Sequence, residues 1–149
     1  MIVIADRLNA TRASVKNALI NRDKDFFLNE VKQIQKAGAD FIDLNTSHSP
    51  DRELEDMLWL IDLIKANFKV QLSIDSENPE LIASALKQIN EPGQIINSTT
   101  LKAKQYEKIF PLMIEHQADL VVLLMDEEIV PRNTQERLML LEKLVKILE

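Results

Sequence analysis

The chain has 149 residues, 46% of them hydrophobic and 28% charged, which is the balance of a globular protein with room for one domain and a sizeable core. A formal net charge of −6, with no basic stripe between aromatic residues, argues against nucleic acid and anionic membranes as partners. The lack of cysteine excludes disulfides, thiolate zinc sites and iron–sulfur ligation by this chain, and it fits a cytoplasmic location.

The first part of the chain alternates an apolar run with two amphipathic stretches. Residues 1–5 are apolar and predict a buried first strand, because the run is far shorter than a signal peptide or a membrane span. A short helix is predicted over residues 12–20 and a stronger one over 25–37, where apolar side chains recur at helical spacing. Gly38 follows as the expected carboxyl-terminal cap.

The rest of the chain repeats this alternation, and each element is expected at a definite place. Predicted strands cover residues 41–45, 68–75, 94–97 and 120–125. Predicted helices begin at Pro50, cover residues 76–88 and 101–116, and begin again near Asn133. Five such strand–helix units indicate an α/β protein with parallel strands. A flavodoxin-like open sheet would be complete with these strands, whereas an eight-stranded barrel of roughly 250 residues would be unfinished.

Polar side chains collect at the carboxyl ends of the predicted strands, where barrel enzymes build their sites, and all are candidate ligand-binding groups. They are Asp6 and Asn9 after the first strand, Asp43 and Asn45 on the second, Asp75 on the third, Asn97 with Ser98 on the fourth, and Asp126 after the fifth. Carboxylates accept paired hydrogen bonds, and amides both donate and accept, which suits the edge of a flat heterocycle. Taken singly, each residue is more typical of a helix cap or a turn.

Asp75 is the residue around which these candidates are organised. Apolar residues occupy one face of the predicted strand 68–75, and Gln71, Ser73 and Asp75 occupy the other. A polar face on a parallel strand needs a ligand or polar partners, because unpaired polar groups in a core are unfavourable. Two interpretations stay open at this point: Asp75 binds a ligand at a barrel mouth, or it caps the helix that follows.

Other classes of site find little support in the sequence. With Gly38 and Gly93 as the only glycines, neither a dinucleotide fingerprint nor a phosphate loop can be written. His48 is expected in a solvent-exposed loop and His116 in a structural position, so no metal site is predicted. Trp59 and the methionines fit helix stripes and are expected in the core. No serine, histidine and acid have the spacing of a hydrolase triad.

Four segments, in their order and spacing, resemble a known family. They are Asp6-Arg-Leu-Asn-Ala-Thr11, Phe41-Ile-Asp-Leu-Asn45, Leu72-Ser-Ile-Asp-Ser76 and Ile95-Ile-Asn-Ser-Thr99, and the stretch Glu107-Lys-Ile-Phe-Pro-Leu112 with Pro131 extends the match. Together they resemble the pterin-binding barrel of methyltetrahydrofolate:corrinoid/iron–sulfur protein methyltransferases. The folate domain of cobalamin-dependent methionine synthase is related, and dihydropteroate synthase is a more distant relative. The resemblance covers the amino-terminal five βα units of that barrel.

The resemblance implies a fold, a function and a set of ligands. Residues 1–149 would form a pterin-binding domain, the amino-terminal portion of a TIM (β/α)8 barrel, that binds methyltetrahydrofolate. The N5 methyl group would pass to the cobalt of a cobalamin or other corrinoid carried by a partner protein, with no metal bound by this chain. Asp75 and Asn97 match the family's pterin-edge ligands, and Asn9 and Asn45 match polar positions of its first two motifs.

The sequence also departs from the family pattern. Ala5 stands in place of a glycine, Asp6 in place of a glutamate, and Thr46 with Ser47 in place of a further glycine. The family's groups nearest the methyl-transfer step are expected beyond residue 149, and the catalytic residues with them. The first and fifth strands would be open edges, so we expect a homodimer or a complementing chain to cover them. Two alternative functions stay open: a non-catalytic pterin-binding or interaction module, and a dihydropteroate-synthase-like enzyme.

Overall fold

The computed structural model describes residues 1–148, in which five β-strands alternate with six α-helices. The strands are β1 (Ile4–Asn9), β2 (Phe41–Asn45), β3 (Gln71–Asp75), β4 (Ile95–Thr100) and β5 (Asp119–Leu123). The helices are α1 (Ala13–Asn21), α2 (Lys24–Lys36), α3 (Glu53–Asn67), α4 (Pro79–Ile89), α5 (Ala103–Glu115) and α6 (Thr134–Leu148). Each predicted helix and strand overlaps an observed one, and β2 has its predicted bounds, but β1 begins later than predicted and includes Asp6 and Asn9, which were expected to follow the strand.

All five strands form one parallel sheet in the order β1-β2-β3-β4-β5. A flavodoxin-like sheet would place its first strand between the second and the third, so the observed order excludes that architecture. Each strand instead pairs with the next one along the chain through a helical crossover, as consecutive units of a barrel do. The predicted fold class, the amino-terminal portion of a TIM (β/α)8 barrel, is confirmed.

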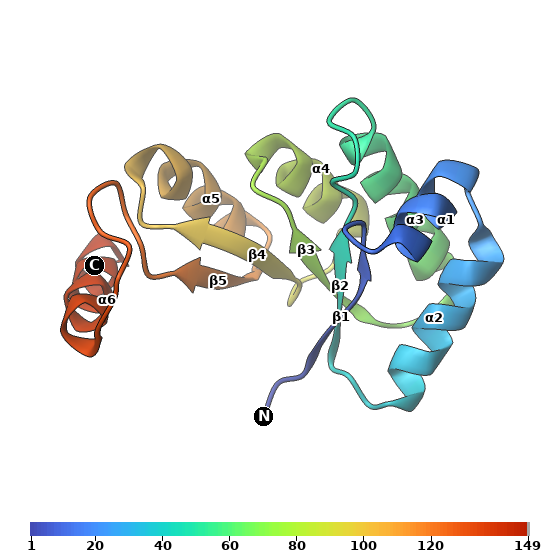
Figure 1. Cartoon of the computed structure of the whole chain (residues 1–149), viewed down its shortest axis with the longest axis horizontal. Coiled ribbons are helices and arrows are strands. Elements are labelled where there is room, and N and C mark those ends of the chain that lie inside the picture. The colour runs from blue at the N-terminus through green and yellow to red at the C-terminus, as the bar shows by residue number, and fades with distance from the viewer. Residues whose placement is uncertain (149) are drawn as a thin grey trace.

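The helices cover one side of the sheet. Figure 1 shows α2, α3, α4 and α5 arranged as an arc along one face of the strands, whereas no described helix lies over the opposite face. α6 lies at the end of this arc, beside β5. The uncovered face is therefore free to carry polar side chains.

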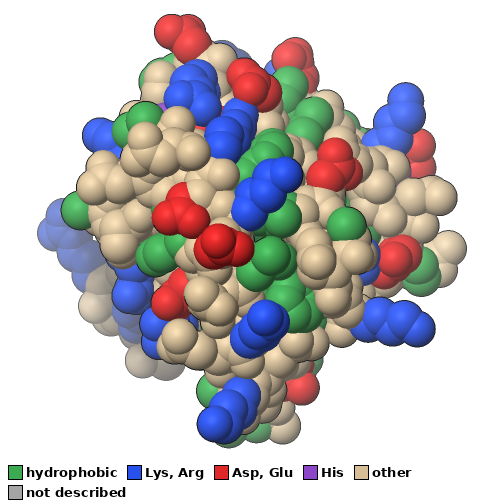
Figure 2. Space-filling model, turned by 90° about the vertical axis from the view of Figure 1, so that its right-hand side faces the viewer, with side chains coloured by type: hydrophobic (Ala, Val, Ile, Leu, Met, Phe, Trp, Pro, Cys, Tyr) green, Lys and Arg blue, Asp and Glu red, His purple; other side chains and the backbone are tan. Residues whose placement is uncertain are grey.

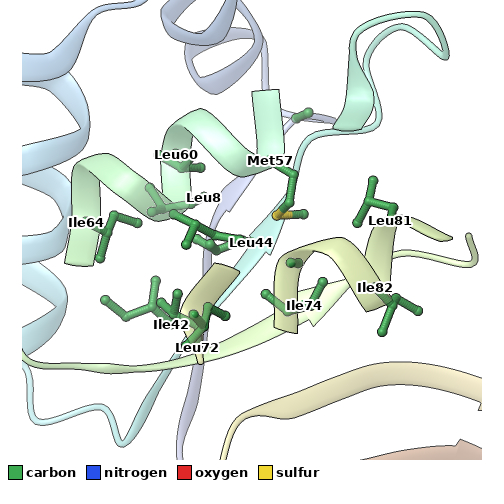
Figure 3. Close-up of a cluster of buried hydrophobic side chains, with 14 of the residues drawn as sticks. Leu8, Ile42, Leu44, Met57, Leu60, Ile64, Leu72, Ile74, Leu81 and Ile82 are labelled. Atoms are coloured by element: carbon green, nitrogen blue, oxygen red, sulfur yellow. The ribbon is translucent and has the colours of Figure 1, made fainter. Parts of the chain in front are cut away.

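The covered face of the sheet holds the hydrophobic core. Alternate residues of each strand pack against helix residues at helical spacing, because one face of the strand and one stripe of the helix are apolar. Figure 3 shows this cluster, to which the strands contribute Leu8, Ile42, Leu44, Leu72 and Ile74, and the helices Met57, Leu60, Ile64, Leu81 and Ile82. All ten side chains are at most 2% exposed, and their burial holds the helices against the covered face of the sheet.

Helix starts and ends follow local sequence signals. The side chain of Asp23 accepts a hydrogen bond from the backbone N–H of Phe26 and so caps α2. Asn78 caps α4 in the same way, with Pro79 at the first helical position. The predicted cap at Gly38 is confirmed by its φ of +81°, a conformation that glycine adopts without strain.

The prediction of a buried strand at residues 1–5 is wrong. β1 begins at Ile4, and the side chains of Met1, Ile2, Val3 and Ile4 are between 37% and 111% exposed. They lie at a free edge of the sheet, where β1 pairs with β2 and with no other described strand. An apolar run is buried only where another element covers it, and the exposure shows that no described element covers this one.

The expectation that Trp59 and the methionines lie in the core is partly wrong. Met57 is fully buried, and Trp59 packs against the core with its ring edge-on to Phe27. Met1 is fully exposed, and Met139 on α6 is 51% exposed. The helical stripe that carries Met139 therefore does not face the core.

α6 buries little of its own surface against the other described elements. Leu140 is its buried residue, while Leu138, Leu141 and other apolar side chains of the helix are more than two-fifths exposed. Its predicted start near Asn133 is confirmed, because Asn133 Oδ1 accepts a hydrogen bond of 3.0 Å from the backbone N–H of Glu136. The expected cover over the open edges of β1 and β5 stays a prediction.

The outer surface near α1, α2 and α3 carries charges of both signs. Figure 2 shows Lys and Arg side chains interspersed with Asp and Glu on this face, with apolar atoms between them. Such a face lacks the field of a single sign that attracts a polyanion.

Across residues 1–148, none of the helices combines the length and the apolar character needed to cross a bilayer.

Candidate functional site

Strand alternation and register place five polar side chains on the uncovered face, and we call them the strand-end group: Asp43, Asn45, Ser73, Asp75 and Asn97. Asp43 lies opposite Ser73 in the register, and Asp75 lies opposite Asn97. Paired residues of neighbouring parallel strands point to the same face, as do residues two apart on one strand. The predicted polar inner face of β2 and β3 is therefore present, and β4 extends it.

Asp43 lies at the centre of the strand-end group. Its Oδ1 accepts a hydrogen bond of 2.5 Å from Ser73 Oγ and one of 3.1 Å from Asn97 Nδ2, and the residue is 3% exposed. Burial raises the pKa of the Asp43 carboxyl above its ordinary value, because the charged form loses its water. The two hydrogen bonds oppose this rise, and the negative charge of Asp75 adds to it.

Asp75, at the end of β3, has one carboxylate oxygen engaged and one free. Oδ2 accepts a hydrogen bond of 2.9 Å from Asn45 Nδ2, whereas Oδ1 has no hydrogen-bond donor within residues 1–148. The alternative that Asp75 caps the next helix is wrong, because α4 begins at Pro79 and Asn78 is its cap. The free carboxylate edge of Asp75 thus has no part in capping and is available to a ligand.

Asn9 and Asn45 occupy matching positions at the ends of β1 and β2 and pair with each other in the register. Each uses its side-chain oxygen to hold the turn that follows. Asn9 Oδ1 accepts from the backbone N–H and the hydroxyl of Thr11, and Asn45 Oδ1 accepts from the same two groups of Ser47. Both amides are therefore turn formers, and their role as pterin ligands stays a prediction.

Ser98 and Asp126 lie outside the hydrogen bonds of the strand-end group in the described chain. Ser98 falls at the register shift of β4. Asp126 Oδ2 contacts Lys143 Nζ at 2.5 Å, and its Oδ1 accepts from the backbone N–H groups of Glu128 and Ile129. The hydrogen bond from Lys143, followed by the backbone bonds, lowers the pKa of Asp126 to about 2. Asp126 thus ties the loop after β5 to α6, and both predicted ligand roles stay predictions.

A cavity of about 530 Å³ opens beside Asp75. It is lined by Asn45, Ser47, Glu53, Asp75, Ser76, Glu77 and Asn78. Its volume lies within the range of small-molecule sites, about 300–1,000 Å³. Sequence reasoning missed Glu53, which accepts a hydrogen bond of 3.2 Å from the hydroxyl of Ser76. The positions of these two residues could have indicated the contact. Ser76 follows Asp75 directly, and Glu53 is the first residue of α3, which borders the same cavity.

A larger hollow of about 710 Å³ lies at the opposite ends of the strands, lined by residues that include Asp40, Lys65, Lys69, Gln71 and Glu91. Lys65 Nζ is already engaged there, by Glu91 at 2.5 Å and by the carbonyl of Val70 at 3.2 Å. In barrel proteins this end of the strands serves stability, so the candidate site is the smaller cavity.

Within residues 1–148, no three His, Cys, Asp or Glu side chains are grouped to hold a metal ion.

The prediction that His48 lies in a solvent-exposed loop is wrong. Its side chain is 4% exposed, and Nε2 lies 2.6 Å from Asp56 Oδ2. Asp56 is fully buried on α3 and also pairs with Arg22 at 2.7 Å and Arg52 at 3.1 Å. This cluster ties the loop that carries Ser47 to α3 and so holds one wall of the cavity. His48, Arg52 and Asp56 follow one another at four-residue spacing, whereas Arg22 joins the cluster from the end of α1, a contact that this spacing does not indicate.

Comparison with known proteins assigns the family. The family described as pterin binding enzyme matches residues 5–148, nearly the whole chain. The chain belongs to the pterin-binding enzyme family. The resemblance drawn from the four strand-end segments is confirmed, and a pterin or folate becomes the ligand class to test at the strand-end group.

Two relatives show how much of a whole protein this chain represents. The methylcorrinoid:tetrahydrofolate methyltransferase of Eubacterium limosum is 26% identical over 148 residues, which are 98% of this chain and 54% of that protein. The chain therefore spans about half the length of this curated relative. Among solved structures, 7,8-dihydropteroate synthase from Vibrio fischeri ES114 matches with a TM-score of 0.56 and 23% identity, over 75% of this chain and 42% of that one. This structural likeness supports the fold.

Proposed function

We propose that residues 1–149 form a pterin-binding domain that holds methyltetrahydrofolate or tetrahydrofolate at the strand-end group. We further propose that the domain takes part in methyl transfer between folate N5 and the cobalt of a corrinoid carried by a partner protein. The observation that carries the proposal is the free carboxylate edge of Asp75, which lies beside a cavity in a chain of the pterin-binding family. The name of the Eubacterium limosum relative supports the pairing of folate with a corrinoid.

The chemistry of the cavity suits the ring of a folate better than its anionic tail. Three carboxylates line it, those of Glu53, Asp75 and Glu77. Such a lining favours a ligand that presents N–H and amino groups, which donate to carboxylate oxygens. It disfavours phosphate or glutamate groups, because like charges repel at short range. We therefore place the pterin ring, with its amino group and ring N–H, against Asp75.

The methyl-transfer step sets separate tasks for the ring-binding residues and for the groups at N5. When methyltetrahydrofolate is the donor, the bond between N5 and the methyl carbon breaks, and N5 keeps the electron pair and gains a proton. The corrinoid supplies cobalt(I) as the nucleophile that takes the methyl group. In this proposal Asp75 and Asn97 hold the ring in place, which is a positioning task. The name of the relative describes the opposite direction, in which the methyl group passes from the corrinoid to tetrahydrofolate. Because a reversible displacement has the same transition state in both directions, the same residues would serve either one.

Two measurements on the same preparation test the proposal. Anaerobic isothermal titration calorimetry with 5-methyltetrahydrofolate is expected to show saturable binding at one site. Incubation with 5-methyltetrahydrofolate and free cob(I)alamin is then followed by absorption, since methylation of the cobalt changes its spectrum. Binding without methyl transfer would support a pterin-binding module that lacks the groups needed at N5. A chain that binds no folate would contradict the proposal as a whole.

A further inference from the structure

The loop between β2 and α3, residues 46–52, is fastened to the start of α3 by two side chains. Thr46 Oγ1 donates a hydrogen bond of 2.9 Å to the backbone carbonyl of Glu53. His48 Nε2 lies 2.6 Å from Asp56 Oδ2, and because a carboxylate oxygen accepts hydrogen bonds, His48 is the donor. These contacts keep the loop beside the cavity, to whose lining it contributes.

Asp56 is a fixed point for this loop. Its Oδ1 pairs with Arg22 at 2.7 Å and with Arg52 at 3.1 Å, which leaves Oδ2 for His48. Arg22 comes from the end of α1, and its guanidinium carbon lies 4.6 Å from the centre of the Trp59 ring. Asp56 is fully buried, and a buried carboxylate held by two cations on one oxygen has little freedom to move. The position of His48 is therefore set from the interior of the protein.

Ser47, the residue before His48, connects this loop to the strand-end group. Its backbone N–H and its hydroxyl both donate to Asn45 Oδ1, at 3.1 Å and 2.8 Å. With that oxygen engaged, the Asn45 amide presents its NH₂ group to the other side, where Nδ2 donates to Asp75 Oδ2 at 2.9 Å. A continuous series of contacts thus runs from the buried carboxylate on α3 to the carboxylate at the end of β3.

The last member of this series is the one that a ligand meets. Asp75 Oδ1 has no hydrogen-bond donor within residues 1–148, and the residue lines the cavity. A carboxylate that is already held in one rotamer spares the ligand the cost of ordering it. That cost is roughly two- to tenfold in affinity for a single side chain. Any contact that fixes Asn45 therefore contributes to ligand affinity without touching the ligand.

We propose that His48 is a positioning residue for this site. Its hydrogen bond to Asp56 holds the turn at Ser47. The turn fixes the Asn45 amide, and the amide keeps Asp75 in the orientation that a ligand meets. The residues that line the cavity in the described chain include Ser47 and leave out His48, so His48 acts through its neighbours. The inference rests on the proposed function, since the ligand is the folate proposed there.

A purely stabilising role for His48 predicts a different result. If the contact with Asp56 served the fold alone, its loss would lower the free energy of unfolding and leave the folded chain with its full affinity for folate. A positioning role predicts a loss of affinity in a chain that stays folded. It also predicts that this loss disappears once Asn45 is replaced, because the series of contacts is then already broken.

Two amide substitutions at position 48 separate these roles. His48→Gln keeps an N–H donor at about the reach of the imidazole Nε2, whereas the donor of His48→Asn is shorter by a methylene group and does not reach Asp56. His116→Asn is the matched control, because His116 ends α5 at the opposite end of the strands. Calorimetric titration of the full chain with 5-methyltetrahydrofolate is expected to show binding weakened roughly two- to tenfold in His48→Asn. His48→Gln and His116→Asn should bind as the unmutated chain does.

Two further measurements complete the test. His48→Asn in an Asn45→Ala chain should cause no further loss of affinity. Hydrogen exchange, followed by NMR without any ligand, should show the Ser47 backbone N–H exchanging about tenfold faster in His48→Asn, because the hydrogen bond that holds the loop to a charged group is lost. The N–H of Leu44, which lies in the paired part of β2, should exchange at its unmutated rate.

The outcomes separate this inference from the proposed function. If the unmutated chain binds no folate, the proposed function fails, and the role of His48 in binding fails with it. If it binds folate and a folded His48→Asn chain binds equally well, the proposed function stands and the inference is overturned. A loss that persists in the Asn45→Ala chain, or an unchanged exchange rate at Ser47, would also overturn the inference. So would weak binding by a folded His48→Gln chain, a result that does not require His48→Asn to fold.

Discussion

Removal of the Ser73 hydroxyl should destabilise the protein more at neutral pH than in mild acid. Ser73 is fully buried, and its hydroxyl donates to the Asp43 carboxylate at 2.5 Å. A hydrogen bond to an ionised group contributes about 1.5–3 kcal/mol, against about 1 kcal/mol for a neutral pair. Ser73→Ala is therefore expected to lower the free energy of unfolding by about 1.5–3 kcal/mol while Asp43 is charged.

The pH dependence follows from the raised pKa of Asp43. Because burial raises this pKa above its ordinary 3.8, the native state holds more protons than the unfolded state just above that pH. Stability therefore falls as the pH rises through the folded-state pKa, and the hydrogen bond from Ser73 opposes that fall. Once the pH falls below the raised folded-state pKa, Asp43 is protonated in the native state, so the effect of Ser73→Ala should shrink to about 1 kcal/mol.

Urea unfolding followed by far-ultraviolet circular dichroism, at about pH 7 and at an acid pH where the pH dependence of the effect has levelled off, measures both values. Ser84→Ala is the control, because the Ser84 hydroxyl donates to the backbone carbonyl of Glu80 and has no charged partner. Its effect should be small and the same at both pH values. A Ser73→Ala effect that is equally small, or that does not change with pH, would refute a charged Asp43 supported by Ser73.

Two further predictions concern the frame around the site. Leu44→Ala should lower the free energy of unfolding by about 3 kcal/mol, because this β2 side chain is fully buried under the helices. Leu141 is 44% exposed, so Leu141→Ala should lower it by less than about 0.5 kcal/mol. Equal effects in urea unfolding would contradict the assignment of the core to the covered face. Asp126→Asn should destabilise the protein above about pH 4, and the difference should disappear as the pH falls toward the Asp126 pKa of about 2. A difference that stays constant between these pH values would show that Asp126 is not held ionised by Lys143 and the backbone.

The alternation of apolar and polar residues on β2 and β3 was sufficient to predict which side chains meet at the strand ends. Asp43 and Asp75 lie on the uncovered face because side chains two apart share a face, whatever the rest of the chain does. The start of α4 was equally local. Asn78 followed by Pro79 is a stronger start signal than Asp75, and that comparison could have removed the cap interpretation without a structure.

Other parts of the site depend on contacts that a linear pattern does not contain. His48 is buried against Asp56 of α3, and Arg22, at the distant end of α1, pairs with the same carboxylate. The first residues of the chain are apolar, yet they lie at a sheet edge without cover, so apolarity misled the prediction there. The turn role of Asn45 could have been predicted in part from local sequence, because asparagine two residues before a serine is a recognisable turn signal.

The central claim is that Asp75 binds a pterin ring at the end of β3, and its most direct test is a folate titration of three proteins. The unmutated chain, Asp75→Ala and Asp119→Ala are each titrated with 5-methyltetrahydrofolate by calorimetry. Asp119 lies at the other end of the sheet and is exposed, so its substitution makes the same change of charge away from the site. Loss of a hydrogen bond to a carboxylate predicts that Asp75→Ala weakens binding by about tenfold or more, while Asp119→Ala binds as the unmutated chain does. Equal affinities for all three proteins would contradict the claim.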